Sequence, residues 1–506
     1  MGDTLREEFL HVPHADHHSA LIAWGAFFLE TERIRNSDAR EYRVMDDDKL
    51  KKKGLRQRGS IGRVTEQYGS RVRARIGQVT NAAEPLGAYH AEGSDPDAGV
   101  AWEPWTVVQF NTHQRFTGLR PRTRYRYQVE IDGERWDQGG HAFTPAKDAR
   151  KGTYRPDPRR RRHEFFTFPA PGDPSGDFAF AVVGDPGTGE PAQYAVGRGL
   201  AARVEPDGIR LLLTTGDNIY ARGGKLGKIV RGALGRAASS GDEDDDWFAS
   251  WFLPYRDTIS RVPVFPAIGN HDSEQSEDDD DLGQMMDNFY LEERMLDEAS
   301  LWGIGDLAQD SIFYRFRYGR DVEFIAVDTS FSDRLRGQNL LDQLITAVKG
   351  KRKPPLLHEN HKLFIQQIED DPHTPAWRIP YGHHPPYSLG PSHDDTELIK
   401  ELAVRLRDSA GVRVWLAGHE HNFQHHARDG IDYVLSGAAG KSGALEGRNG
   451  KPAPSDAVSY TDTPHALVAN IRGGRLRIRL FNEQGQVMPR RLAAPAVPSL
   501  VEIPAA

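Results

Sequence analysis

Five short motifs rich in metal-binding side chains recur along the chain, and each follows an apolar run. The motifs start at Gly184-Asp185, Gly216-Asp217, Gly269-Asn270, Gly382-His383 and Gly418-His419. The runs before them lie at residues 178–183, 209–213, 262–268, 376–380 and 412–417, and the run at 376–380 is the weakest. Near-continuous apolar runs are typical of buried parallel strands, and ligands bind outside the carboxyl ends of such strands. The pattern predicts one metal site and favours a site for two ions.

The length and composition of the chain fit a globular protein of more than one domain. Its 506 residues exceed the roughly 250–300 residues that one hydrophobic core usually serves, so we expect two domains. A net charge of −8 argues against nucleic acid as a stable partner. The absence of cysteine from the sequence excludes disulfides, thiolate metal ligands and a thiol nucleophile.

The most apolar stretch near the start of the sequence, residues 20–29, is interpreted as a core strand. It is shorter than the about 20 apolar residues that a membrane-spanning helix needs. Histidines and acidic residues precede it, whereas a secretory signal carries a basic cluster there. We therefore expect a soluble protein without a membrane partner, cytoplasmic as the sequence stands. An exported or periplasmic location would require that a leader had been removed.

The sequence pattern changes along the chain in a way that predicts four segments. Residues 15–146 alternate apolar and charged positions, as in Tyr125 to Ile131 before the turn Asp132-Gly133, which indicates an N-terminal β-sandwich. Residues 116–125 resemble the turn into a late strand of fibronectin type III modules. The remaining segments are a Pro-, Gly- and Arg-rich linker at 147–176, an α/β domain at 177–486 and a C-terminal tail at 487–506.

The α/β segment alternates apolar runs with stretches of helical spacing. Helices are predicted at 192–204, 226–238, 358–369 and 395–408, and further strands at 322–328, 431–436, 465–471 and 476–481. The last two strands flank Gly473-Gly474 and indicate a hairpin. This order predicts two packed mixed β-sheets flanked by helices.

The residue types of the five motifs suit a hydrolytic centre of two metal ions. Two cations about 3.5–4 Å apart need a bridging anion, several ligands each, and open positions for water and substrate. An aspartate at a strand end can bridge them, and neighbouring glycines allow the backbone to approach closely. Imidazole and carboxylate together suit Zn, Fe, Ni and Mn. Each motif alone is a weak signal, but the ordered set of five is strong.

The ordered set resembles the motifs of the metallophosphoesterase (calcineurin-like) superfamily, over about residues 178–484. Tyr220, three residues after Asp217, makes the set similar to the purple acid phosphatase branch. Plant-type members of that branch also carry a β-rich N-terminal module, in keeping with the fibronectin-III-like segment. Two positions depart from the family pattern, Pro186 in the first motif and Asp272 where glutamate is common, and neither removes a ligand.

The resemblance implies a set of seven ligands for two metal ions. It assigns the first ion to Asp185, Asp217, Tyr220 and His421, and the second ion to Asp217 as a bridge with Asn270, His383 and His419. In the family, the tyrosine-bearing site holds Fe(III), with phenolate-to-iron charge transfer, and the partner ion is Fe(II), Zn or Mn.

The resemblance also implies roles for residues around the ions. A hydroxide activated by the cations would attack phosphorus in line. His271 matches the histidine that contacts substrate in the family, and Asp272 could orient it from behind. His393 lies where family members place a loop histidine that acts as general acid or phosphate clamp.

Other residues of similar type are assigned structural roles. His384 is expected in the pocket wall or at the surface, and His425 and His426 in a strand or loop. The pair His17-His18 is interpreted as surface, because no third ligand is evident around it. Asp328 is interpreted as a cap at the end of a strand.

We therefore expect a metal-dependent phosphatase of the acid phosphatase type, hydrolysing small phosphomonoesters. A phosphodiesterase or nucleotide hydrolase on the same fold is an alternative, because it would use the same ligands. A catalytically inactive binding protein is a second alternative, which an intact ligand set disfavours.

Overall fold

The computed structural model describes most of the chain. The described residues are 3–45, 71–81, 87–108, 112–136, 140–147, 150–220, 247–272, 274–275, 280–281, 283–291, 301–302, 313–330, 359–390, 393, 395–443, 457–489 and 501–503. The predicted helix at 226–238 and parts of the predicted C-terminal tail lie outside these residues. Among the helices so described, none is both long enough and apolar enough to cross a membrane.

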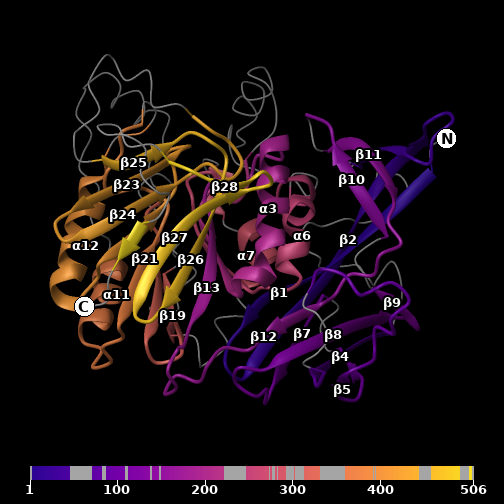
Figure 1. Ribbon diagram of the computed structural model, residues 1–506, viewed down its shortest axis with the longest axis horizontal. Coiled ribbons are helices and arrows are strands. Elements are labelled where there is room, and N and C mark those ends of the chain that lie inside the picture. The colour runs from indigo at the N-terminus through magenta and orange to yellow at the C-terminus, as the bar shows by residue number, and fades with distance from the viewer. Residues whose placement is uncertain are drawn as a thin grey trace.

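Two antiparallel sheets form the N-terminal part of the protein (Figure 1). The first contains β1 (Asp3–Ala15), β2 (Ser19–Arg33), β3 (Arg40–Val44), β7 (His113–Thr117), β10 (His141–Pro145) and β11 (Lys151–Pro156). The second contains β4 (Val72–Val79), β5 (Val100–Trp102), β6 (Thr106–Val107), β8 (Arg124–Ile131), β9 (Glu134–Trp136) and β12 (Glu164–Phe166). Residues 20–29 lie in β2 and are buried throughout, which confirms the predicted core strand.

Strand pairing in this part extends beyond the segment predicted as a sandwich. The predicted turn after β8 has positive φ at Asp132 and Gly133, and β9 pairs back on β8 as a hairpin. The range 147–176, predicted as a linker, contains β11, which pairs with β3 and β10, and β12, which pairs with β8. Part of this Arg-rich segment therefore belongs to both sheets. The likeness to fibronectin type III modules stays a prediction.

Two mixed sheets form the rest of the protein. One has the order β15-β14-β13-β26-β27-β28, with β29 on β27; the other has the order β18-β19-β20-β21-β22-β24-β23-β25. The bounds in the first are β13 (Phe178–Val183), β14 (Ile209–Thr215), β15 (Val264–Ala267), β26 (Ala466–Arg472), β27 (Arg475–Asn482), β28 (Gly485–Val487) and β29 (Val501–Ile503). Those in the second are β18 (Leu301–Trp302), β19 (Tyr314–Tyr318), β20 (Val322–Ala326), β21 (Trp377–Tyr381), β22 (Val414–Ala417), β23 (Phe423–Arg428), β24 (Ile431–Ser436) and β25 (Ala457–Thr461). A separate short ladder joins β16 (Glu274–Gln275) and β17 (Asp280–Asp281).

Aromatic side chains join the two mixed sheets face to face. Phe265 of β15 stacks on Phe316 of β19 with ring centroids 3.8 Å apart. Phe180 of β13 meets Phe324 of β20 edge-on at 5.0 Å. Such pairs contribute about 0.5–1.5 kcal/mol each beyond the area they bury. They hold the two sheets in one layered core, as the sequence predicted.

Helices cover the outer faces of these sheets (Figure 1). They are α3 (Pro191–Asp207), η1 (Phe248–Phe252), α6 (Leu253–Ile259), α7 (Gly283–Phe289), α11 (Glu359–Glu369) and α12 (Glu397–Ala410). The buried side chains of α11 and α12 pack in one cluster with those of β20, β22 and β24. α3 and α12 end at Gly208 and Gly411, both with left-handed φ, as is usual for helix ends. These observations confirm the predicted helices at 192–204, 358–369 and 395–408.

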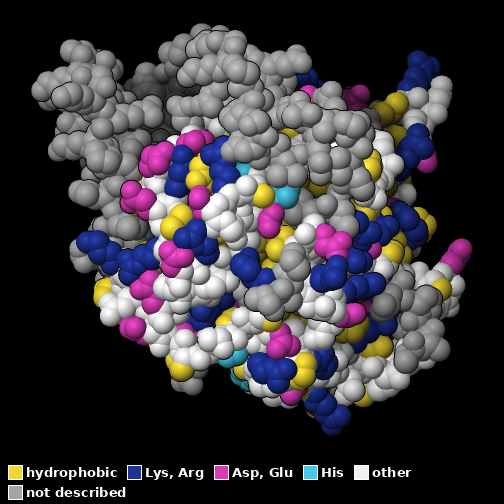
Figure 2. All heavy atoms as spheres, turned by 60° about the vertical axis from the view of Figure 1, so that its left-hand side comes forward, with side chains coloured by type: hydrophobic (Ala, Val, Ile, Leu, Met, Phe, Trp, Pro, Cys, Tyr) yellow, Lys and Arg dark blue, Asp and Glu magenta, His cyan; other side chains and the backbone are white. Residues whose placement is uncertain are grey.

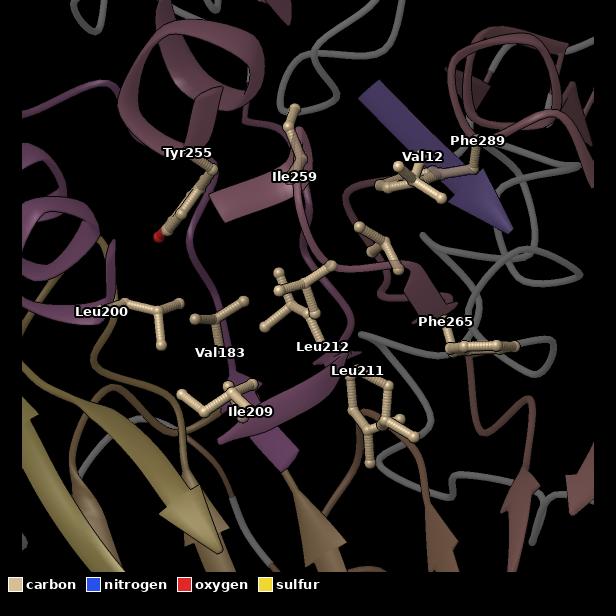
Figure 3. Packing of buried hydrophobic residues seen from close by; sticks show 14 of the residues in the cluster. Val12, Val183, Leu200, Ile209, Leu211, Leu212, Tyr255, Ile259, Phe265 and Phe289 are labelled. Atoms are coloured by element: carbon tan, nitrogen blue, oxygen red, sulfur yellow. The ribbon is translucent and has the colours of Figure 1, made fainter. Parts of the chain in front are cut away.

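The N-terminal strand β1 shares a hydrophobic core with the mixed sheets. Figure 3 shows Val12 of β1 in the same cluster as Leu212 of β14 and Phe265 of β15. Phe9 stacks on Phe252 of η1 with ring centroids 4.2 Å apart. The two parts of the protein are thus packed together through a continuous apolar interior.

We expect Leu212→Ala to lower the free energy of unfolding by about 2–5 kcal/mol, because it leaves a cavity in this interior. Leu212 is 0% exposed, at the centre of β14. The matched control is Leu363→Ala in α11, where the side chain is 51% exposed and a change within about 0.5 kcal/mol is expected. Urea unfolding followed by tryptophan fluorescence measures both. A similar effect of the two substitutions would contradict the assignment of Leu212 to the core.

Candidate metal centre

The carboxyl ends of five strands supply the motif residues. Asp185, Asp217, His383 and His419 each lie two residues beyond the last residue of β13, β14, β21 and β22, and Asn270 lies three beyond β15. β13, β14 and β15 run parallel in one sheet, and β21 and β22 run parallel in the other. Because the sheets are packed together, both sets of strand ends open on the same rim. The structure thus brings these five residues together, as the sequence predicted, in what we call the metal centre.

One side of the metal centre gathers around Asp185, which is fully buried. The hydroxyl of Tyr220 donates to its Oδ1 over 3.1 Å, and His421 Nε2 lies 3.7 Å from the same oxygen. The Tyr220 hydroxyl and His421 Nε2 are themselves 3.3 Å apart. The phenol, the carboxylate and the imidazole therefore face one point, which is the arrangement predicted for the first ion.

The other side of the metal centre gathers around His383, which is also fully buried. Its Nε2 lies 2.9 Å from Asn270 Oδ1, 3.0 Å from His419 Nδ1 and 3.3 Å from Asp217 Oδ1. The ligand atoms of Asp185, Asp217 and His383 all lie within 4.8 Å of one another. Asp217 therefore lies between the two groups, where a bridging ligand is expected.

The donor atoms of this group fit a metal cation. His383 Nδ1 is 2.9 Å from the carbonyl oxygen of Thr215, which can only accept, so Nδ1 carries the hydrogen and Nε2 keeps its lone pair. That lone pair faces the carboxamide oxygen of Asn270 and a carboxylate oxygen of Asp217, which are acceptors too. Acceptors that converge in a buried place are satisfied by a cation between them.

Burial keeps the imidazoles of the metal centre neutral, as metal ligation requires. It lowers the pKa of His383 to about 4 and that of His421 to about 3, and it lowers the pKa of His419 well below its usual value. Burial, and then the charge of Asp217, raise the pKa of Asp185 well above its usual value. Asp185, buried beside the charge of Asp217, therefore favours an added positive charge, which a bound cation would provide.

Backbone conformation at the metal centre is held by close packing of glycines. Asp185, Asp217 and His419 have φ of 52°, 51° and 73°, a left-handed region that costs energy for residues other than glycine. A Cβ atom on Gly418 would lie 2.6 Å from Asp185 Oδ2, and one on Gly269 would lie 2.2 Å from Asp217 Oδ1. The glycines of the motifs are thus needed for space as much as for flexibility.

Asp272 holds the loops of the metal centre through both of its carboxylate oxygens, and its predicted role in orienting His271 stays a prediction. Its Oδ1 accepts from the backbone N–H of Asn218 at 2.7 Å, and its Oδ2 accepts from that of Gly269 at 2.7 Å. The side-chain amide of Asn218 donates to Oδ2 over 2.9 Å. Burial and the charge of Asp217 raise the pKa of Asp272 to about 8. Asp272 therefore fixes the turn that carries Asn270 and His271.

The two histidines predicted to act on the substrate lie at the edge of the metal centre. The backbone N–H of His271 donates to Asp217 Oδ1 over 3.0 Å, and its ring centroid is 4.6 Å from that of Tyr220. The ring of His393 lies 3.7 Å from that of His419 and 6.2 Å from that of His421. Both imidazoles can therefore reach a group bound over the ligands.

Glu420 supports His393 and was not singled out from the sequence. It is 1% exposed, and its Oε2 accepts from the backbone N–H of His393 over 2.9 Å. Gly390 packs directly on this carboxyl group, since a Cβ there would lie 1.8 Å from Glu420 Cδ. The position of Glu420 between His419 and His421 is the sequence signal that could have identified it.

Most of the remaining histidines and Asp328 have the structural roles predicted for them. His384 is 8% exposed and lies 4.3 Å from the His419 ring, in the wall of the centre. In β23, His425 pairs with Asp432 and His426 with Gln424. Asp328 accepts from the N–H of Ser330 over 3.0 Å, as a strand cap does.

The pair His17-His18 differs from its prediction in one respect, because Asp16 does offer a third ligand atom near it. The carboxylate of Asp16 already accepts hydrogen bonds from the backbone N–H groups of His18 and Ser19 and from the Ser19 hydroxyl. Its position is thus explained by the turn between β1 and β2.

Comparison with known proteins gives a family match over the region that carries the motifs. Residues 178–423 match the model of the calcineurin-like phosphoesterase family. Purple acid phosphatase 17 of Arabidopsis thaliana is 37% identical over 68 residues, which are 13% of this chain. The chain spans 20% of the length of that relative.

Two solved structures share the fold over almost the whole chain. The structure of PhoD gives a TM-score of 0.55 at 12% identity and covers 98% of this chain and 92% of PhoD. Purple acid phosphatase PPD1 from seeds of yellow lupin (Lupinus luteus) gives 0.51 at 11% identity and covers 99% of this chain and 74% of PPD1. The protein therefore has the metallophosphoesterase fold, and its residues 178–423 are similar to the calcineurin-like phosphoesterases.

We expect Gly418→Ala to reduce the bound metal to less than about half of the parent value, because its Cβ would displace the Asp185 carboxylate. Gly172→Ala is the control, since a Cβ there meets nothing within 4 Å. Elemental analysis of both proteins after metal loading and dialysis gives the metal-to-protein ratio. An unchanged ratio in Gly418→Ala would show that Asp185 does not bind metal.

Proposed function

We propose that this protein is a metal-dependent phosphatase that hydrolyses small phosphomonoesters, similar to the purple acid phosphatases. The observation that carries the proposal is the convergence of carboxylates, imidazoles, a phenol and a carboxamide from five strand ends. The match of residues 178–423 to the calcineurin-like phosphoesterases supports hydrolysis of phosphoesters. The short match to a purple acid phosphatase supports that branch.

The proposed centre holds Fe(III) in the site of Tyr220 and Fe(II), Zn or Mn in the other. The ligands are Asp185, Tyr220 and His421 for the first ion, Asn270, His383 and His419 for the second, and Asp217 for both. Bound there, two cations supply Lewis acidity toward a phosphoryl oxygen and make a water nucleophilic near neutral pH.

His271 and His393 are the proposed catalytic residues of this chain. His271 lies beside Tyr220 and Asp217, from where its imidazole would hold a phosphoryl oxygen. His393 would give a proton to the leaving oxygen, with its loop held by Glu420. Burial lowers the pKa of His393 to about 4, so its protonated form grows as the pH falls toward that value. This direction favours activity at acidic pH.

The proposal is tested by comparing two substrates on protein loaded with Fe and Zn. We expect kcat/KM for p-nitrophenyl phosphate to exceed that for bis(p-nitrophenyl) phosphate by at least about tenfold. A reversed order would identify a phosphodiesterase, and no turnover of either ester by protein with full metal content would identify an inactive binding protein.

We expect Asp217→Asn to lower kcat for p-nitrophenyl phosphate by at least about 100-fold, because the neutral amide cannot bridge two cations. The control is Asp370→Asn at an exposed position beyond α11, where the rate should stay within about twofold. Turnover by Asp217→Asn near the parent rate would exclude the bridging role.

We expect a broad visible charge-transfer band from Tyr220 bound to Fe(III), lost in Tyr220→Phe. The control is Tyr194→Phe, a buried tyrosine of α3 whose hydroxyl donates to the carbonyl of Ala249 over 2.7 Å. Absorption spectra of the iron-loaded proteins make the comparison. Active protein that holds only Zn or Mn would refute the iron assignment and leave the hydrolysis proposal standing.

A further inference from the structure

A lysine lies beside the metal centre, on the segment that follows β24. Lys441 is exposed, and its Nζ lies 5.6 Å from the centroid of the Tyr220 ring. After burial, the charge of Lys441 is the largest cause that lowers the pKa of His421. The ammonium group is therefore close to the site proposed for the first ion.

The backbone on both sides of Lys441 is fixed to the loops of the metal centre. The N–H of Ala439 donates to the carbonyl of Gly184 over 3.1 Å, and the N–H of Gly443 donates to that of His421 over 2.6 Å. The Thr188 hydroxyl donates to the carbonyl of Gly440 over 2.9 Å. The backbone of Lys441 is thus held in place, although its side chain is exposed to solvent.

The charge of Lys441 is available for an anion at this place. Among the described residues, its ammonium makes no ion pair with a carboxylate. The face of the Tyr220 ring lies under it, in a cation–π contact. The Tyr220 hydroxyl is 3.1 Å from Asp185 Oδ1 and 3.3 Å from His421 Nε2, whereas the ammonium lies over the ring. Lys441 can therefore attract a substrate without competing for the ligand atoms.

We propose that Lys441 is a specificity-determining residue, which binds the phosphoryl group and favours dianionic monoesters over monoanionic diesters. This inference rests on the proposed function of the metal centre. An ammonium group attracts a doubly charged group about twice as strongly as a singly charged one at the same distance. A monoester also presents one more unesterified oxygen to the three N–H donors of the lysine. The same contact would hold inorganic phosphate, the product of monoester hydrolysis.

The proposal is tested with Lys441→Met, which removes the charge and keeps most of the length of the side chain. On Fe- and Zn-loaded protein we expect kcat/KM for p-nitrophenyl phosphate to fall about tenfold, mainly through KM, and that for bis(p-nitrophenyl) phosphate to change less than about threefold. Lys441→Arg should stay within about threefold of the parent for both esters, because it keeps the charge. Lys362→Met, on the exposed face of α11, is the control for loss of a surface charge.

Equal loss for both esters, or no loss for either, would overturn the role of Lys441. Calorimetric binding of inorganic phosphate to the metal-loaded proteins gives a second measurement that needs no turnover. We expect Lys441→Met to weaken this binding about tenfold at an unchanged metal-to-protein ratio. If the parent binds phosphate but hydrolyses neither ester, the proposed function fails, while the comparison of phosphate affinities still decides the role of Lys441.

Discussion

Two carboxylates buried side by side are the constraint on which the rest of this structure depends. Asp185 and Asp217 are almost fully excluded from water, and burial followed by the charge of Asp217 raises the pKa of Asp185 well above its usual value. Leaving both charged without compensation would cost several kcal/mol, so the site calls for positive charge. The neutral imidazoles that surround them supply lone pairs and no such charge. Metal cations would satisfy both requirements at once, and the fold provides the rigid frame that holds the two carboxylates side by side.

That frame consists of parallel strands whose ends meet. The backbone is strained at residues proposed as ligands, just beyond these strand ends. Three of the proposed ligands adopt left-handed φ, and glycines next to them admit no Cβ. One stacked and one edge-on aromatic pair join the two sheets across the layers. The loops beyond the strands are further tied down by buried side chains such as Asp272 and Glu420.

The surface around this frame carries mixed charge: on the face in Figure 2, Lys and Arg side chains lie interspersed with Asp and Glu.

The sequence predicted most of the fold and the grouping of the ligands, because both follow from local patterns. Apolar runs identified β13 and β14. Because these strands are parallel neighbours, their carboxyl ends lie side by side and bring Asp185 and Asp217 together. What the sequence did not predict depends on partners far along the chain. β11 and β12 form in an Arg-rich segment because β3 and β8 offer backbone groups with which they pair. The partners of Asp272, the support of His393 by Glu420 and the place of Lys441 all depend on how loops from different strands meet.

The contact between Phe9 and Phe252 has a consequence for how the chain reaches its native state. β1 is synthesised long before η1, yet its apolar face is covered only when the central part of the chain has folded. Contacts between residues so distant in sequence raise the contact order. A high contact order slows folding and prolongs the exposure of aggregation-prone apolar strands. Excising the mixed sheets alone would expose to water the apolar surface that β1 covers, so the N-terminal sheets act as a cover for the core of the mixed sheets.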